Sequence, residues 1–537
     1  MTGLHTYLPQ DRLAALGRGE TLPDLTSGAA LFADISGFTP LTEALTQQLG
    51  PRRGIEELTR QINAVYDALI SEIEKAGGSV IGFAGDAITC WLDGDTGLRA
   101  VAAALALQAA MSAFPSLGLK VAVTSGPARR FAVGDPAIQQ LDALAGATVA
   151  RLAAAEHLAN RGEVVIDTAT AATLAEAVVI SAWRAADGGE RFAVVKDLTA
   201  TPAPLADQPA NTLEADSLRP WVLTAVFERE RGGHGAFLTE LRPTVALFLR
   251  FGGIDYDADG QAEQELNSFV SHTQAIVARY EGALLQLTIG DKGSYLYASF
   301  GATVAHEDDA RRAVQAALQL RRMAAELGFL EAVQIGVSSG TMRVGPYGGS
   351  TRRTYGALGD DTNLAARLMG AAVPGEILIS GRVHKEIVDL FSFEPRPPLP
   401  VKGKAEPLPV FAVIDQRRQR AIRLEEHSYA LPMMGRQAEL ALIDEKLALA
   451  AQGQGQIIGI TADAGMGKSR LVAEVIRLAR KRGFTGYGGA CEASGASTPY
   501  LVWKAIWQAF FDVDPAAPLR RQIRNLEGEI EDRAPSR

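Results

Sequence analysis

Two segments of the chain carry the same order of short apolar runs and glycine turns, and this internal repeat limits the possible folds more than any other feature. Residues 31–38 can be aligned with residues 247–254, and residues 162–166 with residues 375–379. Each aligned block is a short apolar run beside a glycine. We call the two copies the first repeat and the second repeat, and we expect them to share one strand order.

Within the first repeat, apolar side chains recur every three or four residues, which is typical of an amphipathic helix. They are Ile55, Leu58, Ile62, Val65, Leu69 and Ile73. Short apolar runs at residues 80–83 and 89–92 predict two strands after this helix. Helices that alternate with strands predict an α/β sandwich in each repeat.

Composition limits the class of protein. The 537 residues are 47% hydrophobic and 21% charged, which is ordinary for a globular protein and excludes disorder as the main state. The net charge of −9 argues against a nonspecific grip on nucleic acid. Only two cysteines occur, and the longest mostly apolar stretch, residues 101–110, is far too short to span a membrane. We therefore expect a cytoplasmic protein with no membrane span and no disulfide framework.

Breaks in the pattern divide the chain into segments. One break is rich in proline and another is rich in Arg and Glu, and both are typical of linkers. The predicted segments are the first repeat at residues 26–198, a linker at 199–240, the second repeat at 241–415, a linker at 416–429 and a third unit at 430–537.

Two aspartates of the first repeat are candidate metal ligands. Asp34 lies where an apolar strand gives way to a glycine turn, and Asp86 lies between two short apolar strands. Adjacent strands of one sheet would bring both carboxylates together. A divalent cation that is bound to a nucleotide phosphate needs only a few hard oxygen ligands from the protein, because substrate oxygens complete its coordination shell. These two carboxylates would supply such ligands. The alternative is that each aspartate only caps a turn or a helix, a common role for Asp.

Residues 32–39 and 83–87 resemble the first catalytic domain of class III nucleotidyl cyclases, and the run Asp-Ile-Ser-Gly-Phe-Thr is the most specific part of this resemblance. The resemblance implies that Asp34 and Asp86 hold two Mg²⁺ ions, with Mn²⁺ or Ca²⁺ as substitutes, and that the carbonyl of Ile35 joins them. One ion would lower the pKa of the ribose 3′-hydroxyl of ATP for attack on the α-phosphate.

The second repeat carries different groups. At the position of Asp34 it has Arg250, whose charge would repel a metal ion. It offers instead Asn363 and Arg367, one helical turn apart on one face of a predicted helix. The resemblance implies that this Asn orients the ribose and that this Arg stabilises charge on the phosphorus, a task that suits the several donors of a guanidinium group. The alternative is a polar pair on the surface of an Ala-rich helix.

The losses in the two repeats are complementary. Because the repeats keep the same spacing around this helix, Asn363 aligns with Ala150 and Arg367 aligns with Ala154. A head-to-tail pairing of the repeats would therefore make one complete site and one degenerate site. We predict tandem class III cyclase domains, each an α/β (α+β) sandwich, that pair within the chain as a pseudo-heterodimer.

Further residues resemble groups that bind the base and the phosphates. Asp-Lys-Gly at Lys292 resembles the soluble adenylyl cyclases, where the lysine donates to an adenine ring nitrogen and so favours ATP over GTP. The family's usual side-chain acceptor for the base is replaced here by Gly356, which weakens base selectivity. Lys402, our first choice, and Lys404 resemble the phosphate-binding strand, although a solvated basic edge strand is the alternative.

The third unit contains a glycine-rich motif. Residues 457–461 predict an apolar strand, and a loop that ends in Gly-Lys-Ser leads from it into a predicted helix, which is typical of a P-loop NTPase. Its candidate nucleotide-binding residues are Gly465, Gly467, Lys468, which would reach the β and γ phosphates of a second nucleotide, and Ser469, which would reach its magnesium ion. No apolar strand with two acidic residues at its end follows, so we expect a partial NTPase domain, either cut short or unable to hydrolyse its nucleotide.

In the order cyclase, cyclase, ATPase, the chain resembles bacterial soluble-type adenylyl cyclases over nearly its whole length. The resemblance implies that ATP is converted to cyclic AMP and pyrophosphate at the interface of the repeats. It also implies that a regulatory partner, which the sequence does not identify, controls this activity. A nucleotide-sensing relative without turnover is the main alternative, favoured by Gly356, and guanylyl cyclase activity is a lesser one. Bicarbonate activates many such cyclases through a lysine at the position of Gly82 and an arginine near Ala153, so we expect little stimulation here.

Overall fold

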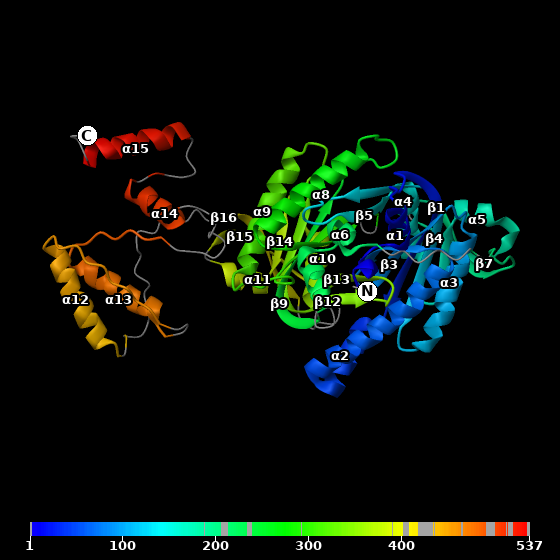
Figure 1. The fold of residues 1–537 in the computed structure, drawn as a ribbon, viewed down its shortest axis with the longest axis horizontal. Helices are drawn as coiled ribbons and strands as arrows, with labels where there is room; N and C mark the ends of the chain where they lie inside the picture. The colour runs from blue at the N-terminus through cyan, green and yellow to red at the C-terminus, as the bar shows by residue number, and fades with distance from the viewer. Residues whose placement is uncertain are drawn as a thin grey trace. The chain divides into compact units, whose positions relative to one another are not determined.

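The computed structural model forms two compact units, Met1–Gln416 and Arg417–Arg537 (Figure 1). It describes residues 3–186, 188–203, 205, 213–233, 239–290, 293–388, 390–400, 407–416, 433, 435–462, 466–489, 500–511, 513 and 519–533.

The first repeat folds into an eight-stranded sheet with the strand order β2-β3-β1-β4-β6-β8-β7, and β5 pairs with β4 outside this path. β4 and β6 are parallel, whereas β1 is antiparallel to both β3 and β4. Its elements are β1 (Leu25–Ser36), α2 (Phe38–Lys75), β2 (Ser79–Ala84), β3 (Ala87–Asp93), α3 (Leu98–Ala110), β4 (Gly118–Val133), β5 (Leu141–Ala145), α4 (Ala147–Leu158), β6 (Val164–Asp167), α5 (Thr168–Leu174), β7 (Val178–Ala185) and β8 (Arg191–Leu198).

The second repeat forms an eight-stranded sheet with the equivalent order β10-β11-β9-β12-β14-β16-β15, and β13 pairs with β12 outside this path. The register agrees as well, because Leu31 pairs with Val123 in one sheet and the aligned Leu247 pairs with Val337 in the other. Its elements are β9 (Glu240–Phe251), α8 (Ala262–Arg279), β10 (Ala283–Thr288), β11 (Ser294–Phe300), α9 (Asp309–Glu326), β12 (Gln334–Gly348), β13 (Arg353–Leu358), α10 (Asp360–Ala371), β14 (Ile377–Ser380), α11 (Gly381–Ile387), β15 (Phe391–Leu399) and β16 (Leu408–Gln416). The predicted common strand order is confirmed.

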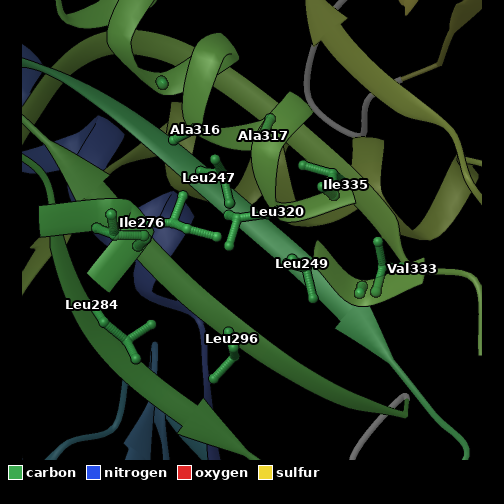
Figure 2. Close-up of a cluster of buried hydrophobic side chains, with 14 of the residues drawn as sticks. Leu247, Leu249, Ile276, Leu284, Leu296, Ala316, Ala317, Leu320, Val333 and Ile335 are labelled. Carbon is green, nitrogen blue, oxygen red and sulfur yellow. The ribbon is translucent and has the colours of Figure 1, made fainter. Parts of the chain in front are cut away.

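Each sheet buries its apolar face under two long helices. In the second repeat, Leu247 and Leu249 of β9 pack against Ile276 of α8 and Leu320 of α9 (Figure 2). In the first repeat, the predicted amphipathic stripe lies in α2, and its Val65, together with other apolar residues of that helix, packs into the core. Removing such side chains from water is the main driving force for folding.

Two β-hairpins are exchanged between the repeats. The hairpin of β4 and β5 leaves the first sheet and places Phe131 and Val133 in the core of the second repeat. The hairpin of β12 and β13 leaves the second sheet and places Tyr347 in the core of the first repeat. Each repeat thus completes the apolar core of the other, and the two form one unit.

Matched hydrogen bonds relate the two hairpins by a pseudo-twofold operation. The backbone N–H of Gly134 donates to Asn267 Oδ1 of α8 at 2.8 Å. At the aligned positions, the N–H of Gly348 donates to Asn63 Oδ1 of α2 at 3.4 Å. An isologous contact of this kind is what a twofold pairing of two equivalent domains produces. The predicted intramolecular pseudo-heterodimer is therefore confirmed.

Helices outside the repeats pack against the second repeat. They are η1 (Gly3–Tyr7), α1 (Gln10–Arg18), α6 (Ala215–Leu218), η4 (Arg219–Trp221) and α7 (Thr224–Arg231). Leu4, Leu8 and Val226 share an apolar cluster with Phe248 and Tyr355 of the second repeat. The segment before the first repeat and the linker after it therefore both contact the second repeat.

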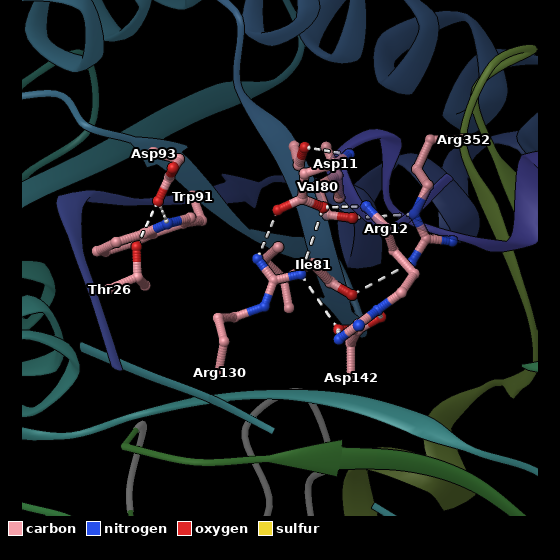
Figure 3. A network of polar contacts seen from close by, with 11 residues as sticks. Asp11, Arg12, Thr26, Val80, Ile81, Trp91, Asp93, Arg130, Asp142 and Arg352 are labelled. Carbon is pink, nitrogen blue, oxygen red and sulfur yellow. Dashed lines mark hydrogen bonds and ion pairs between the residues drawn. The ribbon is translucent and has the colours of Figure 1, made fainter. Parts of the chain in front are cut away.

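Charged side chains join α1 to the exchanged hairpin of the first repeat (Figure 3). Arg12 Nη2 lies 2.7 Å from Asp142 Oδ1, and Arg130 contacts Asp11 at 2.7 Å and Asp142 at 3.1 Å. The side chains of Arg12, Arg130 and Asp142 are at most 6% exposed. Burial alone would raise the pKa of Asp142, but the charges of Arg130 and Arg12 outweigh it and lower that pKa.

Arg352 holds the hairpin of β12 and β13 against the first sheet, beside this ion network (Figure 3). Its Nε donates to the carbonyl of Val80 at 2.9 Å, and its Nη2 donates to the carbonyl of Ile81 at 3.2 Å. The register of β2 shifts at this point, between Val80 and Gly82. Arg352 therefore satisfies carbonyls at an irregularity of the first sheet, and burial lowers the pKa of its guanidinium to about 10.

The second unit contains α12 (Gln437–Ala451), α13 (Lys468–Lys481), α14 (Leu501–Phe510) and α15 (Leu519–Arg533). The predicted strand at residues 457–461 is wrong, because this segment has no regular structure and Ile457 is fully exposed. A strand needs a neighbour for its backbone hydrogen bonds, and the described part of this unit contains no strand that could pair with it. The predicted helix after the loop is α13. Of the residues described, no helix combines the length and apolarity needed to cross a bilayer.

The ion network predicts a stability effect. Asp142→Asn should lower the free energy of unfolding by about 3 to 5 kcal/mol, because it leaves the buried Arg12 without a charged partner and leaves Arg130 with Asp11 alone. Because the pKa of Asp142 is lower in the folded state, this contribution is present above about pH 4 and is lost as the pH falls. Urea unfolding of the variant measures the loss.

Asp216→Asn is the matched control, since Asp216 pairs with Arg231 at 3.6 Å on an exposed surface. It should change the free energy of unfolding by less than about 1 kcal/mol. Equal effects of the two variants would contradict a structural role for the buried network.

Candidate active site

The structure brings the two candidate metal ligands together at one edge of the first sheet. Asp34 of β1 pairs with Ala87, the residue after Asp86, in the register of β1 and β3. The N–H of Ile35 donates to the carbonyl of Asp86 at 3.2 Å. Asp34 is half-buried and Asp86 is exposed, so both carboxylates are accessible from the same edge.

The turn that carries Asp86 is tightly held. It has only two residues between the paired Ala84 and Ala87, and Gly85 adopts a φ of +66°, which a two-residue hairpin favours. The hydroxyl of Tyr66 in α2 donates to the carbonyl of Gly85 at 3.0 Å. Burial raises the pKa of Tyr66, and the nearby Tyr347 and the charges of Asp86 and Asp34 raise it further. Tyr66 is therefore a neutral donor that fixes the turn beside both carboxylates.

These residues fit a divalent cation that is bound mainly through its substrate. Both candidate ligands are hard carboxylate oxygens, which Mg²⁺ prefers. Among the described residues, no group of three or more His, Cys, Asp or Glu side chains forms a complete metal cage. A pair of carboxylates leaves coordination positions for phosphate oxygens and water, which is the usual mode for Mg²⁺ on a nucleotide.

The equivalent edge of the second repeat differs in charge and length. Arg250 pairs with Tyr295, as Asp34 pairs with Ala87. Its guanidinium lies against Gly293, where an added Cβ would be 2.6 Å from Arg250 Nε. Six residues, 289–294, separate the paired Thr288 and Tyr295, compared with two residues in the first repeat. This edge offers a cation in place of the two carboxylates.

The exchanged hairpin of the second repeat contacts α2 and the strand that leads into the Asp86 turn. Arg343 Nε donates to Thr59 Oγ1 of α2 at 2.6 Å, and the N–H of Ser350 donates to Asp67 Oδ1 of α2 at 2.5 Å. Desolvation by burial lowers the pKa of Arg343 to about 10. The ring of Tyr347 lies 5.8 Å from that of Phe83, close to the Asp86 turn. The second repeat therefore reaches the aspartate edge through this hairpin.

α10 follows the hairpin directly and carries the two polar candidates. It begins after Gly359, as α4 begins after the aligned Gly146. Asn363 and Arg367 are both exposed on one face, one turn apart. Within the described part of the chain, neither side chain forms a hydrogen bond or an ion pair. Both are therefore available to a ligand.

A contact in the degenerate half indicates where α10 lies. Gly290, in the loop that corresponds to the Asp86 turn, lies against Val149 in the first turn of α4, where an added Cβ would be 2.6 Å from the Val149 side chain. The pseudo-twofold operation carries Val149 onto Thr362 of α10. The pseudo-symmetry therefore predicts that the first turn of α10 faces the Asp86 turn.

The degenerate cleft itself is mostly apolar. Ala150 and Ala154 occupy the positions of Asn363 and Arg367. Arg151 is engaged elsewhere, because its Nε contacts Asp167 at 2.6 Å and its Nη2 donates to the carbonyl of Ser125 at 2.9 Å. The cavity at this place is lined by Phe32, Thr89, Val149, Leu152, Ala153, Glu156, Thr288 and Ile289.

Several predicted site residues lie outside the described residues. They are Lys292, Lys402, Lys404 and Gly465. In the second unit, Gly467 precedes α13 with a φ of +81°, and Ser469 is exposed in its first turn. Lys468 Nζ donates to the carbonyl of Ala462 at 2.6 Å, across the loop.

Tyr66 and Tyr347 were not predicted. Tyr66 adjoins Val65 in an amphipathic stripe, and an aromatic residue there indicates only core packing. Tyr347 aligns with Val133 of the first repeat, so the alignment of the repeats contained a signal: a hydroxyl is present in one copy only.

A family model described as "Adenylate and Guanylate cyclase catalytic domain" matches residues 261–414, which lie in the second repeat.

Relatives over most of the chain include "Adenylate cyclase type 10" of rabbit (Oryctolagus cuniculus), 21% identical over 504 residues, and of human, 21% identical over 512 residues. Each alignment covers 85% of this chain and 31% of the relative, so the chain spans about a third of their length. "Adenylate cyclase 1" of Rhizobium meliloti is 25% identical over 197 residues, which are 34% of this chain and 29% of that protein.

Similar solved structures include the adenylyl cyclase CyaB from P. aeruginosa, with 26% identity, a TM-score of 0.31, and coverage of 34% of this chain and 97% of that one. A class III adenylyl cyclase-like ATP-binding protein from Pseudomonas aeruginosa aligns with 12% identity and a TM-score of 0.47, covering 71% of this chain and 94% of that one.

Proposed function

We propose that this chain, whose residues 261–414 match the adenylate and guanylate cyclase catalytic domain, is a class III nucleotidyl cyclase that converts ATP to 3′,5′-cyclic AMP and pyrophosphate. The observation that carries the proposal is the complementary loss. Asp34 and Asp86 lie on the repeat that lacks Asn363 and Arg367, and these lie on the repeat that has Arg250 in place of a metal ligand. Pairing through the exchanged hairpins would unite the two half-sites.

The first repeat supplies the metal half of this site. Asp34, Asp86 and the carbonyl of Ile35 would hold two Mg²⁺ ions, for which Mn²⁺ or Ca²⁺ would substitute. When bound, such ions lower the pKa of a hydroxyl and neutralise phosphate charge. The Tyr66 hydroxyl keeps the Asp86 turn in place, so the carboxylates are positioned before the nucleotide arrives.

The second repeat supplies the groups that act on the nucleotide. Arg367 presents a planar fork of donors to the α-phosphate, where negative charge is redistributed as the 3′-oxygen attacks and pyrophosphate leaves. Asn363, one turn earlier, both donates and accepts hydrogen bonds and would orient the ribose. We further assign Lys292 to the base, and Lys402 and Lys404 to the phosphates.

We also propose the domain boundaries, a second nucleotide site and the cellular compartment. Residues 26–198 and 241–415 are the two cyclase domains, and residues 430–537 are part of a P-loop NTPase domain. Gly465, Gly467, Lys468 and Ser469 would bind a second nucleotide there. The cytoplasm, which holds ATP, is the proposed compartment. A nucleotide sensor without turnover is the second candidate, because Gly356 supplies no side chain to the base.

Product analysis by chromatography, with ATP and GTP in parallel reactions, tests the activity. Asp34→Asn and Asp86→Asn should each lower cyclic AMP formation by more than tenfold, a barrier increase above about 1.4 kcal/mol, because each removes a charged oxygen ligand. Asp197→Asn, an exposed change on β8 at the opposite end of the sheet, should leave the rate unaltered. Wild-type chain that binds ATP but forms no cyclic product would establish the sensor instead.

Arg367→Ala should lower kcat by about 10²- to 10³-fold and change the affinity for ATP little, because its contact strengthens as charge develops. Steady-state kinetics combined with the affinity for unreactive 3′-deoxy-ATP separates the two effects. Arg322→Ala removes an exposed arginine of α9 and serves as the control. Weaker nucleotide binding at an unchanged rate would make Arg367 a ground-state phosphate ligand.

Bicarbonate should not stimulate turnover at fixed pH. A small anion needs a well-placed cation, but Gly82 has no side chain and Arg151 is committed to Asp167. Rates are compared in bicarbonate and in matched chloride. A several-fold rise in bicarbonate alone would show that another cation serves the degenerate cleft.

A further inference from the structure

Tyr347 lies at the boundary between the two half-sites. The residue is 5% exposed, and its ring lies 6.2 Å from that of Tyr66 and 5.8 Å from that of Phe83. Among the residues that the structure describes, its hydroxyl has no hydrogen-bond partner. A hydroxyl that no protein group engages, on a ring that is otherwise packed, can exchange hydrogen bonds with a ligand.

The pseudo-symmetry supplies an internal comparison. Tyr347 aligns with Val133, which has the same place in the other exchanged hairpin and packs wholly within an apolar core. Purely structural packing at this position thus needs no hydroxyl. The polar group occurs only in the hairpin that faces Asp34 and Asp86, whose charges act on the adjoining Tyr66.

Gly356 makes room for this hydroxyl. Gly356 of β13 lies diagonally opposite Tyr347 on the same face of the hairpin. A Cβ added at Gly356 would lie 2.9 Å from Cε1 and 3.6 Å from the hydroxyl oxygen of Tyr347. The tyrosine therefore occupies the space that a side chain at residue 356 would need.

We propose that the Tyr347 hydroxyl, for which Gly356 leaves room, binds the 6-substituent of the purine base of the substrate. This inference rests on the proposed function, which puts a nucleotide between the aspartates and α10. A hydroxyl both accepts and donates, so it can accept from the 6-amino group of ATP and donate to the 6-oxo group of GTP. The site is thus specific for 6-substituted purine nucleoside triphosphates, and any preference for ATP over GTP comes from another residue.

The test measures binding, not turnover. The full chain carries Lys468→Ala, so that the second unit does not contribute nucleotide binding. Calorimetry compares 3′-deoxy-ATP with the analogue whose purine lacks the 6-amino group. The parent should bind 3′-deoxy-ATP about tenfold more tightly than the unsubstituted analogue. Tyr347→Phe keeps the ring but should bind both analogues equally, at the weaker affinity.

Tyr355→Phe is the matched control. It removes a hydroxyl from the same hairpin, but one that already donates to the carbonyl of Ala302 at 2.9 Å, so the tenfold preference should persist. A full preference in Tyr347→Phe would overturn the role of Tyr347 while leaving the cyclase proposal intact. A parent chain that binds neither analogue would overturn both.

Discussion

The exchange of two β-hairpins is the interaction on which the rest of the structure depends. Phe131 and Val133 of the first repeat complete the core of the second, and Tyr347 of the second repeat lies in the core of the first. Neither repeat could bury these side chains alone. The hydrogen bonds from Gly134 and Gly348 to the aligned asparagines fix the direction of the exchange. The composite site follows from this pairing, because its two halves belong to different repeats.

The pseudo-twofold pairing of the repeats creates two clefts, and the different residues of the two repeats make these clefts chemically different. At one cleft the hairpin of β12 and β13 meets a short turn that carries Asp86. At the other, a longer loop of the second repeat presses Gly290 against Val149, and the lining is mainly apolar. Divergence between the repeats therefore separated a polar site from a packing contact, while both sheets kept the same strand order.

Features that depend on local order could be predicted from the sequence. The common strand order, α2, β2, β3 and α13 follow from apolar periodicity and from glycine positions, and the convergence of Asp34 and Asp86 follows from adjacent strand ends. The strand predicted at residues 457–461 failed because an apolar run specifies a strand only where a neighbour can pair with it.

Contacts between distant segments could not be predicted in the same way. Arg12 contacts Asp142, 130 positions away, and Arg130 contacts Asp11, 119 positions away, and nothing in their local sequence indicates these partners. The hydrogen bond from Tyr66 to Gly85 could not be predicted either, because the sequence pattern indicates only that Tyr66 is a core residue of an amphipathic helix. Such groups position a site without belonging to any motif.

Mixing two inactive variants tests the central claim most directly. Asp34→Asn retains an intact second repeat, and Arg367→Ala retains an intact first repeat. If the repeats pair within one chain, equimolar mixing of the two full-length variants, measured by cyclic AMP formation from ATP, should give no more activity than the sum of the separate variants. Recovery of a substantial fraction of the wild-type rate on mixing would contradict the account, because it would show that the site forms between chains.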